Sequence, residues 1–100
     1  MERIIPNVRQ VLWYVLAGTR GGPTRISILK LLKDRPYNSN QLSTTLKLDY
    51  KTIQHHLKVL EENRLIITEE RKYGKMFFLS PMLEQSIEMF EEIAEKLKVV

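Results

Sequence analysis

Apolar residues recur at intervals of three and four along the first third of the chain, which is the spacing of one helix face. Pro6 can begin a first helix, and the glycine-rich segment 18–22 ends it. A second helix begins at Pro23 and stops at residues 34–36. Because Trp13 and Tyr14 lie off the main apolar stripe, we expect the first helix to be buried on more than one side.

Two further helices are predicted in the middle of the chain, separated by a turn at residues 47–49. Asn38 caps the first of them, and Gln41 occupies the capping-box position three residues on. Asp49 caps the second, which runs to about residue 62. The inward-facing residues of this second helix follow the i, i+4, i+7 spacing: Ile53, Leu57 and Leu60.

After this helix, the spacing of apolar residues changes from one typical of helices to one typical of strands. Segments 65–68 and 76–79 are short, apolar and rich in β-branched or aromatic residues, which predicts a hairpin. Its connection, residues 69–75, has Gly74 as the turn residue with positive φ. Ser80 and Pro81 then predict one continuous final helix, whose apolar residues form a heptad seam. Two strands are too few for a free-standing sheet, so the hairpin must pack on the helices.

This order of elements predicts a mainly α fold with a small β-hairpin, the α-α-α-α-β-β-α order of a winged helix-turn-helix. The length of 100 residues suits a single domain over 1–100. Within it we expect an N-terminal helix and loop at 1–22, a helix-turn-helix core with its wing at 23–80, and a C-terminal helix at 81–100.

Composition narrows the possible chemistry. The chain has no cysteine, which excludes disulfides, thiolate metal sites and cysteine nucleophiles. Its longest apolar run, residues 11–17, is far shorter than the ~20 residues that cross a bilayer. We therefore expect a cytoplasmic, nucleoid-associated protein without a membrane partner and without a cofactor.

The net charge of +4 is unevenly distributed along the chain. Residues 1–80 hold fourteen Lys and Arg against seven Asp and Glu, whereas residues 81–100 hold two Lys against five Glu. This division predicts a body that binds a polyanion and a C-terminal segment held away from it.

The helix after Asp49 carries the side chains that can read double-stranded DNA, since the second helix of a helix-turn-helix enters the major groove. An amide can pair with adenine, Lys or His can donate to guanine, and Thr and Tyr can reach a thymine methyl or a phosphate. The outward face contains no acidic residue and consists of Tyr50, Lys51, Thr52, Gln54, His55 and Lys58.

The hairpin connection is a second candidate contact with DNA. Its basic and phenolic side chains can touch phosphates or the adjoining minor groove: Arg71, Lys72, Tyr73 and Lys75. Glu69 and Glu70 argue against a deep insertion into the groove.

Four segments together resemble the ArsR-type winged-helix regulators: 23–25 (PTR), 28–29 (IL), 41–42 (QL) and, above all, 53–60 (IQHHLKVL). The resemblance covers roughly residues 20–80. It implies a homodimeric transcriptional regulator, usually a repressor, that dimerises through its first and last helices. Two features agree with dimerisation through these helices: the first helix is apolar on more than one face, and the last one has a heptad seam. The candidate interface residues are Val8, Leu12, Val15, Leu83, Ile87, Phe90, Ala94 and Leu97.

The sequence departs from the family pattern at its metal sites. Residues 39–42 (SNQL) replace the cysteine motif of the metal-sensing members, and the final helix has no His or Asp for a zinc site. The adjacent His55 and His56 point about 100° apart on a helix and cannot easily share an ion. We expect His55 to face DNA and His56 to be buried and hydrogen-bonded. Where the family often has Gly, this chain has Arg64, so Asn63 is expected to take the left-handed turn.

The alternative function is a winged-helix module that binds proteins without reading DNA. Its support is the aromatic and Met content expected at the surface: Trp13, Tyr14, Tyr73, Phe77, Phe78, Met82 and Met89. RNA binding lacks the paired aromatic platform that single strands need, and no motif supports an enzyme. The sequence leaves the effector and the operator open, and also which of the two helices forms the interface.

Overall fold

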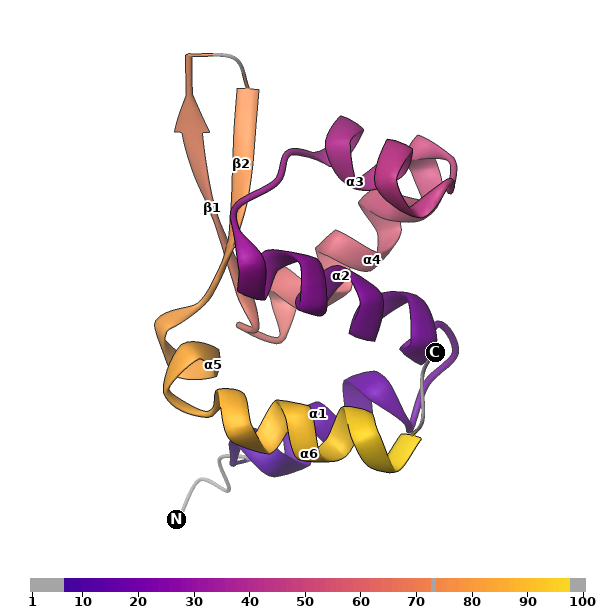
Figure 1. Ribbon diagram of the computed structural model, residues 1–100, viewed down its shortest axis with the longest axis vertical. Helices are drawn as coiled ribbons and strands as arrows, with labels where there is room; N and C mark the ends of the chain where they lie inside the picture. Colours follow the sequence, from indigo (N-terminus) through magenta and orange to yellow (C-terminus); the bar gives the residue numbers. More distant parts are fainter. Residues whose placement is uncertain (1–6, 73, 98–100) are drawn as a thin grey trace, which may run out of the picture.

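The computed structural model describes residues 7–72 and 74–97 (Figure 1). In chain order its elements are α1 (Val8–Leu16), α2 (Gly22–Asp34), α3 (Ser39–Leu46), α4 (Tyr50–Glu62), β1 (Ile66–Arg71), β2 (Gly74–Leu79), α5 (Pro81–Gln85) and α6 (Ile87–Leu97). A mainly helical chain with one antiparallel hairpin confirms the predicted winged helix-turn-helix fold.

The predicted caps determine where the central helices begin. The Asn38 Oδ1 atom accepts a hydrogen bond from the Gln41 N–H at 2.8 Å, and the Gln41 side chain accepts one from the Asn38 N–H at 2.9 Å. Asp49 and Ser80 likewise cap α4 and α5 with their side chains. Pro6, the predicted start of the first helix, lies outside the described residues.

A pair of glycines allows the close turn between α1 and α2. Gly21 has a φ of +90°, and a Cβ atom there would lie 2.5 Å from Cε1 of His56. A Cβ atom at Gly22 would lie 1.9 Å from the carbonyl oxygen of Leu16. The backbone of this connection therefore approaches α1 and α4 more closely than any side chain would permit.

The hairpin is longer than the apolar pattern predicted. Residues 69–71, expected in the connection, pair with residues 74–76 and extend both strands. These added residues are exposed or half-buried, so they carry no period-2 alternation for a sequence pattern to detect. Gly74 has a φ of +113°, which confirms its role as the turn residue with positive φ.

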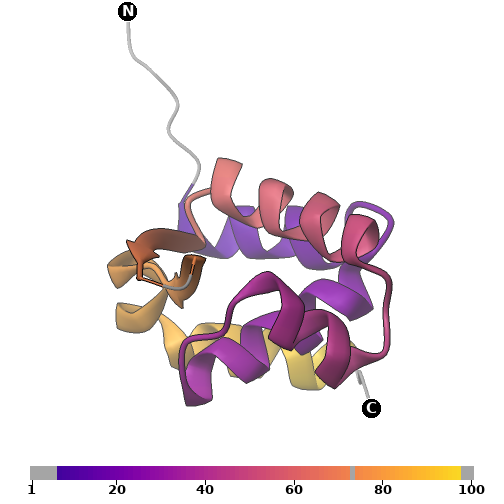
Figure 2. The same cartoon turned by 90° about the horizontal axis from the view of Figure 1, so that it is seen from above.

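A backbone bridge fixes the hairpin to the helical body. The Phe77 N–H in β2 donates to the Tyr37 carbonyl at 2.8 Å, and the Tyr37 N–H donates to the Phe77 carbonyl at 3.3 Å. This bridge adds a short third edge to a sheet that two strands alone would leave marginal. The segment between α2 and α3 thereby holds the wing beside the helix-turn-helix (Figure 2).

The left-handed residue after α4 is Arg64, with a φ of +59°, and not Asn63 as expected. Asn63 keeps a φ of −93° because its side-chain amide donates to the Val59 carbonyl at 2.8 Å and caps the helix end. The Leu65 N–H then donates to the Leu60 carbonyl at 3.0 Å, which closes the turn around Arg64.

The single final helix predicted for residues 81–100 is also a correction, because it breaks at Ser86 into α5 and α6. Ser86 has φ and ψ of −117° and 25°, outside the helical values. The break lets the chain turn, so that α6 runs across the end of the molecule opposite the far end of the hairpin (Figure 1).

The predicted dimer residues lie mostly inside the protomer. α1 packs on α2 and on α6 within one chain. This packing buries Leu12, Val15, Leu83, Phe90 and Ala94 to 3 % exposure or less. These five side chains form the chain's own core and present no surface to a partner, which corrects their predicted role. The other three, Val8, Ile87 and Leu97, are only partly buried.

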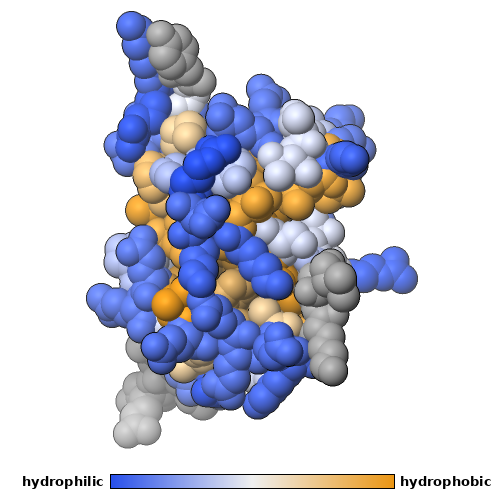
Figure 3. Space-filling model, in the orientation of Figure 1, coloured by the Kyte–Doolittle hydropathy of each residue, from blue (hydrophilic) through white to orange (hydrophobic). Residues whose placement is uncertain are grey.

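The surface divides by polarity. In Figure 3, hydrophilic side chains cover the far end of the hairpin and much of the end that carries α6, and hydrophobic ones show in a band between them. Within residues 7–72 and 74–97, no helix is both long and apolar enough to cross a membrane.

Candidate nucleic-acid interface

The hairpin, α3 and α4 extend toward the same end of the molecule, opposite α1 and α6 (Figure 1). α3 ends at Lys47, which adopts a left-handed conformation with a φ of +57°. The Leu48 N–H donates to the Ser43 carbonyl at 3.1 Å, and the Ser43 hydroxyl donates to the Leu48 carbonyl. These bonds set the turn from α3 into α4 and so the direction in which α4 points.

The start of α4 is held by Asp49. Its carboxylate accepts a hydrogen bond from the Thr52 N–H at 2.7 Å. This hydrogen bonding to Thr52, with a smaller contribution from the Lys51 charge, holds the pKa of Asp49 below its usual range. The acidic group at the start of the outward face of α4 is thus fixed at the helix end.

The inward face of α4 is anchored as the spacing predicted: Ile53, Leu57 and Leu60 are buried to 2 % exposure or less. The six residues expected on the other face include one, Thr52, that is half-buried. The remaining five side chains are exposed: Tyr50, Lys51, Gln54, His55 and Lys58.

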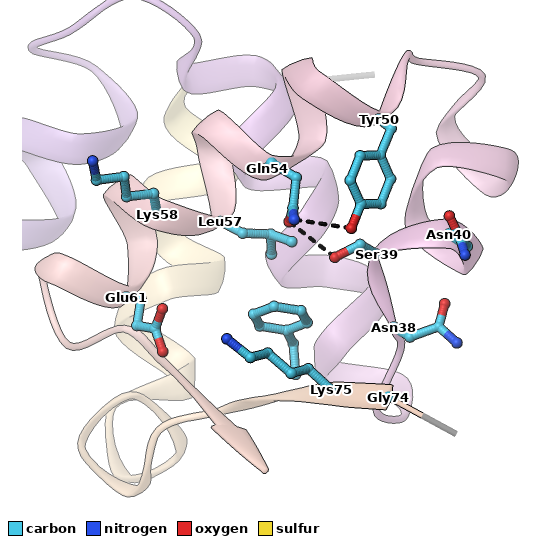
Figure 4. A pocket seen from close by; sticks show the side chains of 11 residues that line it. Asn38, Ser39, Asn40, Tyr50, Gln54, Leu57, Lys58, Glu61, Gly74 and Lys75 are labelled. Carbon is cyan, nitrogen blue, oxygen red and sulfur yellow. Dashed lines mark hydrogen bonds between the residues drawn. The ribbon is translucent and has the colours of Figure 1, made fainter. Parts of the chain in front are cut away.

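The side-chain amide of Gln54 bonds two neighbouring hydroxyl groups (Figure 4). Its Oε1 atom accepts a hydrogen bond from the Ser39 hydroxyl at 3.0 Å, and its Nε2 atom donates to the Tyr50 hydroxyl at 3.0 Å. Sequence reasoning did not single out Ser39. The pattern showed only that Ser39 begins the helix after the Asn38 cap, and no spacing rule connects residue 39 with residue 54.

A groove of about 470 Å³ separates α4 from the wing. Lys58 and Glu61 line it from α4, and Lys75 lines it from β2 (Figure 4). Asn38 and Asn40 line it at the start of α3. The groove therefore offers amide groups and two ammonium groups, together with one carboxylate in the last turn of α4.

The wing cations have different surroundings. Arg71 Nε lies 3.0 Å from Glu69 Oε1, and its guanidinium lies 5.4 Å from the ring centre of Phe78. Arg71 therefore already has an anionic partner, although both side chains are about half exposed. Lys72 and Lys75 are exposed, and Tyr73 lies outside the described residues.

Residues 22–68 match the model of one protein family, the bacterial regulatory proteins of the arsR family. The matched residues run from α2 through the helix-turn-helix into β1. This segment is an ArsR-family domain. The family consists of DNA-binding transcriptional regulators, so the match points to a DNA-binding transcriptional regulator rather than an enzyme.

Solved structures share the fold of the ArsR-family domain and its flanking helices. Reduced HlyU from Vibrio cholerae N16961 is 24 % identical, with a TM-score of 0.67 over 90 % of this chain and 87 % of that one. Rv0081 from M. tuberculosis is 20 % identical, with a TM-score of 0.68 over 86 % and 85 %. ST1889 from Sulfolobus tokodaii is 20 % identical, with a TM-score of 0.59 over 88 % of each chain. No curated protein matches the sequence.

His56 of the ArsR-family domain is buried, as expected, at 7 % exposure. Its Nδ1 atom accepts a hydrogen bond from Arg25 Nε at 3.1 Å. Burial, followed by the charges of Arg25 and His55, lowers the pKa of His56 from its ordinary value of 6.5. In the described part of the chain, no three potential His, Cys, Asp or Glu ligands gather around a common point.

Proposed function

We propose that this chain is a homodimeric repressor that reads a pseudo-palindromic operator with α4 in the major groove. The observation that carries this proposal is the outward face of α4. Its side chains from Tyr50 to Lys58 are exposed or half-buried, none is acidic, and the cationic wing extends toward the same end. Such a face meets phosphates without repulsion and presents donors and acceptors to base edges.

The side chains of this face have distinct proposed roles. Gln54 pairs with adenine, while Lys51 and His55 donate to guanine. Lys58 and Tyr50 contact phosphates, and Thr52 supports the helix start, where its N–H bonds Asp49. The wing contributes sequence-independent phosphate contacts through Arg71, Lys72, Tyr73 and Lys75.

A second copy of the chain would join through the surface that α1 and α6 leave partly uncovered. Val8, Ile87 and Leu97 are only partly buried there, and Tyr14 on α1 is 59 % exposed. A symmetric dimer places two copies of α4 about one helical turn of DNA apart, at roughly 10–10.5 bp or a multiple. The operator half-sites would have the same spacing.

Selection of bound duplexes from a random pool tests DNA reading, symmetry and spacing together. We expect a pseudo-palindrome, and we expect Gln54→Ala and His55→Ala each to weaken specific binding by about 1–3 kcal/mol. Exposed Lys96 on α6, at the other end of the molecule, supplies the matched control Lys96→Ala. Variants at Gln54 and His55 that bind every selected duplex as the parent does would reject this reading face.

A protein-binding module is the second candidate, favoured by a groove of about 460 Å³ beside the base of the wing, whose lining is part apolar and part polar. Ile67, which is 45 % exposed, and Met82 line it. Of the aromatic residues expected at the surface, Phe77 is in fact buried at 5 % exposure. A steep fall in duplex affinity with added salt supports the DNA reader, and no duplex binding at low salt supports the protein-binding module.

A further inference from the structure

The Ser39 hydroxyl is directed at Gln54 and is not needed for helix capping. Ser39 is the first residue of α3 and is 9 % exposed. The cap of this helix is already complete, because Asn38 and Gln41 bond each other's backbone N–H. The hydroxyl instead donates to Gln54 Oε1 at 3.0 Å, across the helix-turn-helix.

The Tyr50 hydroxyl holds the opposite end of the same amide. It lies one helical turn before Gln54 and accepts from Gln54 Nε2 at 3.0 Å. Because this hydroxyl accepts the bond, its own O–H remains able to donate to a phosphate. The terminal torsion of a free glutamine is broad, so two bonds on opposite ends of the amide fix an orientation that the backbone alone does not.

The amide retains the bonding groups that an adenine requires. A glutamine amide has two acceptor positions on its oxygen and two N–H donors. Ser39 occupies one acceptor position and Tyr50 occupies one donor, which leaves one of each. One free acceptor and one free donor remain, and they are the kinds of group that bond the N6 amino group and N7 of adenine in the major groove.

We propose that Ser39 is a positioning residue for base reading: it holds the Gln54 amide ready for an adenine and so sets specificity without touching DNA. This inference rests on the proposed function. Without the hydroxyl, Gln54 must be ordered when DNA binds, and the loss of one neutral hydrogen bond corresponds to roughly a three- to ten-fold effect. The loss falls on the favoured base alone, because contacts with phosphates do not use Gln54.

The test measures a ratio of affinities in the full chain. Selection with the parent and with Gln54→Ala first identifies the base pair at which Gln54→Ala loses preference. Duplexes carrying the favoured or a substituted base at that position then give the discrimination ratio for each variant. Ser39→Ala removes the hydroxyl, Ser39→Thr keeps it, and Ser27→Ala removes a hydroxyl that bonds only the Pro23 carbonyl within α2.

We expect Ser39→Ala to lower the discrimination ratio about three- to ten-fold with unchanged affinity for non-specific duplex, whereas Ser39→Thr and Ser27→Ala keep the parent ratio. A Ser39→Ala ratio equal to that of the parent overturns the positioning role and leaves the proposed function intact. An equal loss in Ser39→Thr also overturns it, because the hydroxyl is present. If Gln54→Ala loses preference at no base, this inference fails while duplex binding by the parent still stands. If the parent binds no duplex, the proposed function itself fails.

Discussion

The guanidinium of Arg25 in α2 donates a hydrogen bond from Nε to Nδ1 of His56 in α4, over 3.1 Å. The same guanidinium donates from one terminal nitrogen to the Val15 carbonyl at 3.1 Å and to the Thr19 hydroxyl at 2.7 Å. Arg25 is 3 % exposed, and its bonds to His56 and Val15 are buried, while the bond to Thr19 is partly buried. One side chain thereby connects the end of α1, the loop after it and α4, the helix proposed to read DNA.

Replacing Arg25 should destabilise the fold strongly. Arg25→Met keeps the length of the side chain but leaves His56 Nδ1 without its donor in the interior and removes one of the side-chain donors to the Val15 carbonyl. We expect a loss of about 2–4 kcal/mol in the free energy of unfolding, measured by urea denaturation. The control is Arg20→Met on an exposed side chain, which should stay within about 0.5 kcal/mol of the parent. Equal midpoints for the two variants would contradict the structural role of Arg25.

Acid should weaken the fold through His56. Burial first, then the charges of Arg25 and His55, lowers the pKa of His56 in the folded chain below 6.5. The unfolded chain therefore binds a proton at a pH where the folded chain does not, and stability falls as the pH drops from about 6.5 toward the folded pKa. Well above pH 6.5, His56 is neutral in both the folded and the unfolded chain, so it adds no pH dependence to the stability.

Urea midpoints between pH 7.5 and pH 5 measure this dependence. His56→Gln should flatten the part of the slope that begins near pH 6.5, whatever its effect on overall stability. His55→Gln, on an exposed neighbour, should retain most of it, because burial is the largest cause of the shift. An unchanged slope in His56→Gln would assign the acid sensitivity to other groups.

Alanine substitutions at two glycines with positive φ can distinguish the cost of backbone strain from the cost of steric overlap. Gly21 and Gly74 have φ values of +90° and +113°. A Cβ atom at Gly74 would meet nothing within 4 Å, whereas one at Gly21 would lie 2.5 Å from His56 Cε1. We expect Gly74→Ala to destabilise by about 1–2 kcal/mol, the strain alone, and Gly21→Ala to destabilise clearly more. Thermal melting of both variants under the same conditions checks the order, and equal losses would mean that His56 moves aside freely.

Local signals in the sequence were sufficient for the starts of α3, α4 and α5 and for the wing turn. The capping box of Asn38 with Gln41 and the positive φ at Gly74 depend on residues three or fewer positions apart. Such short-range features can be predicted from the sequence alone. The inward residues of α4 were equally accessible, because their spacing is a property of the helix itself.

Contacts between residues far apart in the sequence could not be predicted from such local signals. Helical spacing shows that Leu12 and Phe90 lie on apolar faces, but it does not show whether a partner chain or the same chain covers them. Here the same chain does. The buried role of Arg25 depends on residues 10 and 31 positions away, and that of Ser39 on one 15 positions away. No periodicity connects such pairs.

Salt dependence should distinguish the wing cations from one another. Each phosphate contact contributes about 0.9 to the slope of log affinity against log salt. Lys75→Ala should lower the slope by about that amount for every duplex sequence. Arg71→Ala should lower it by less, because removing Arg71 also frees Glu69, its present ion-pair partner. Lys96→Ala on α6 is the control and should leave the slope unchanged. A change of base preference in Lys75→Ala would contradict a contact with phosphate alone.

The partly buried residues of α1 and α6 should control dimerisation, whereas their buried neighbours should control folding. Ile87 packs at the edge of the core and keeps part of its surface, while Phe90, three residues on, is 1 % exposed. Glutamate at position 87 adds a charge to the proposed dimer surface, so Ile87→Glu should give a folded monomer. Phe90→Glu places an unpaired charge in the core and should unfold the chain. Light scattering gives the mass and circular dichroism the helix content. A folded dimer in Ile87→Glu would move the interface away from the start of α6, and a folded monomer in Phe90→Glu would return Phe90 to the interface.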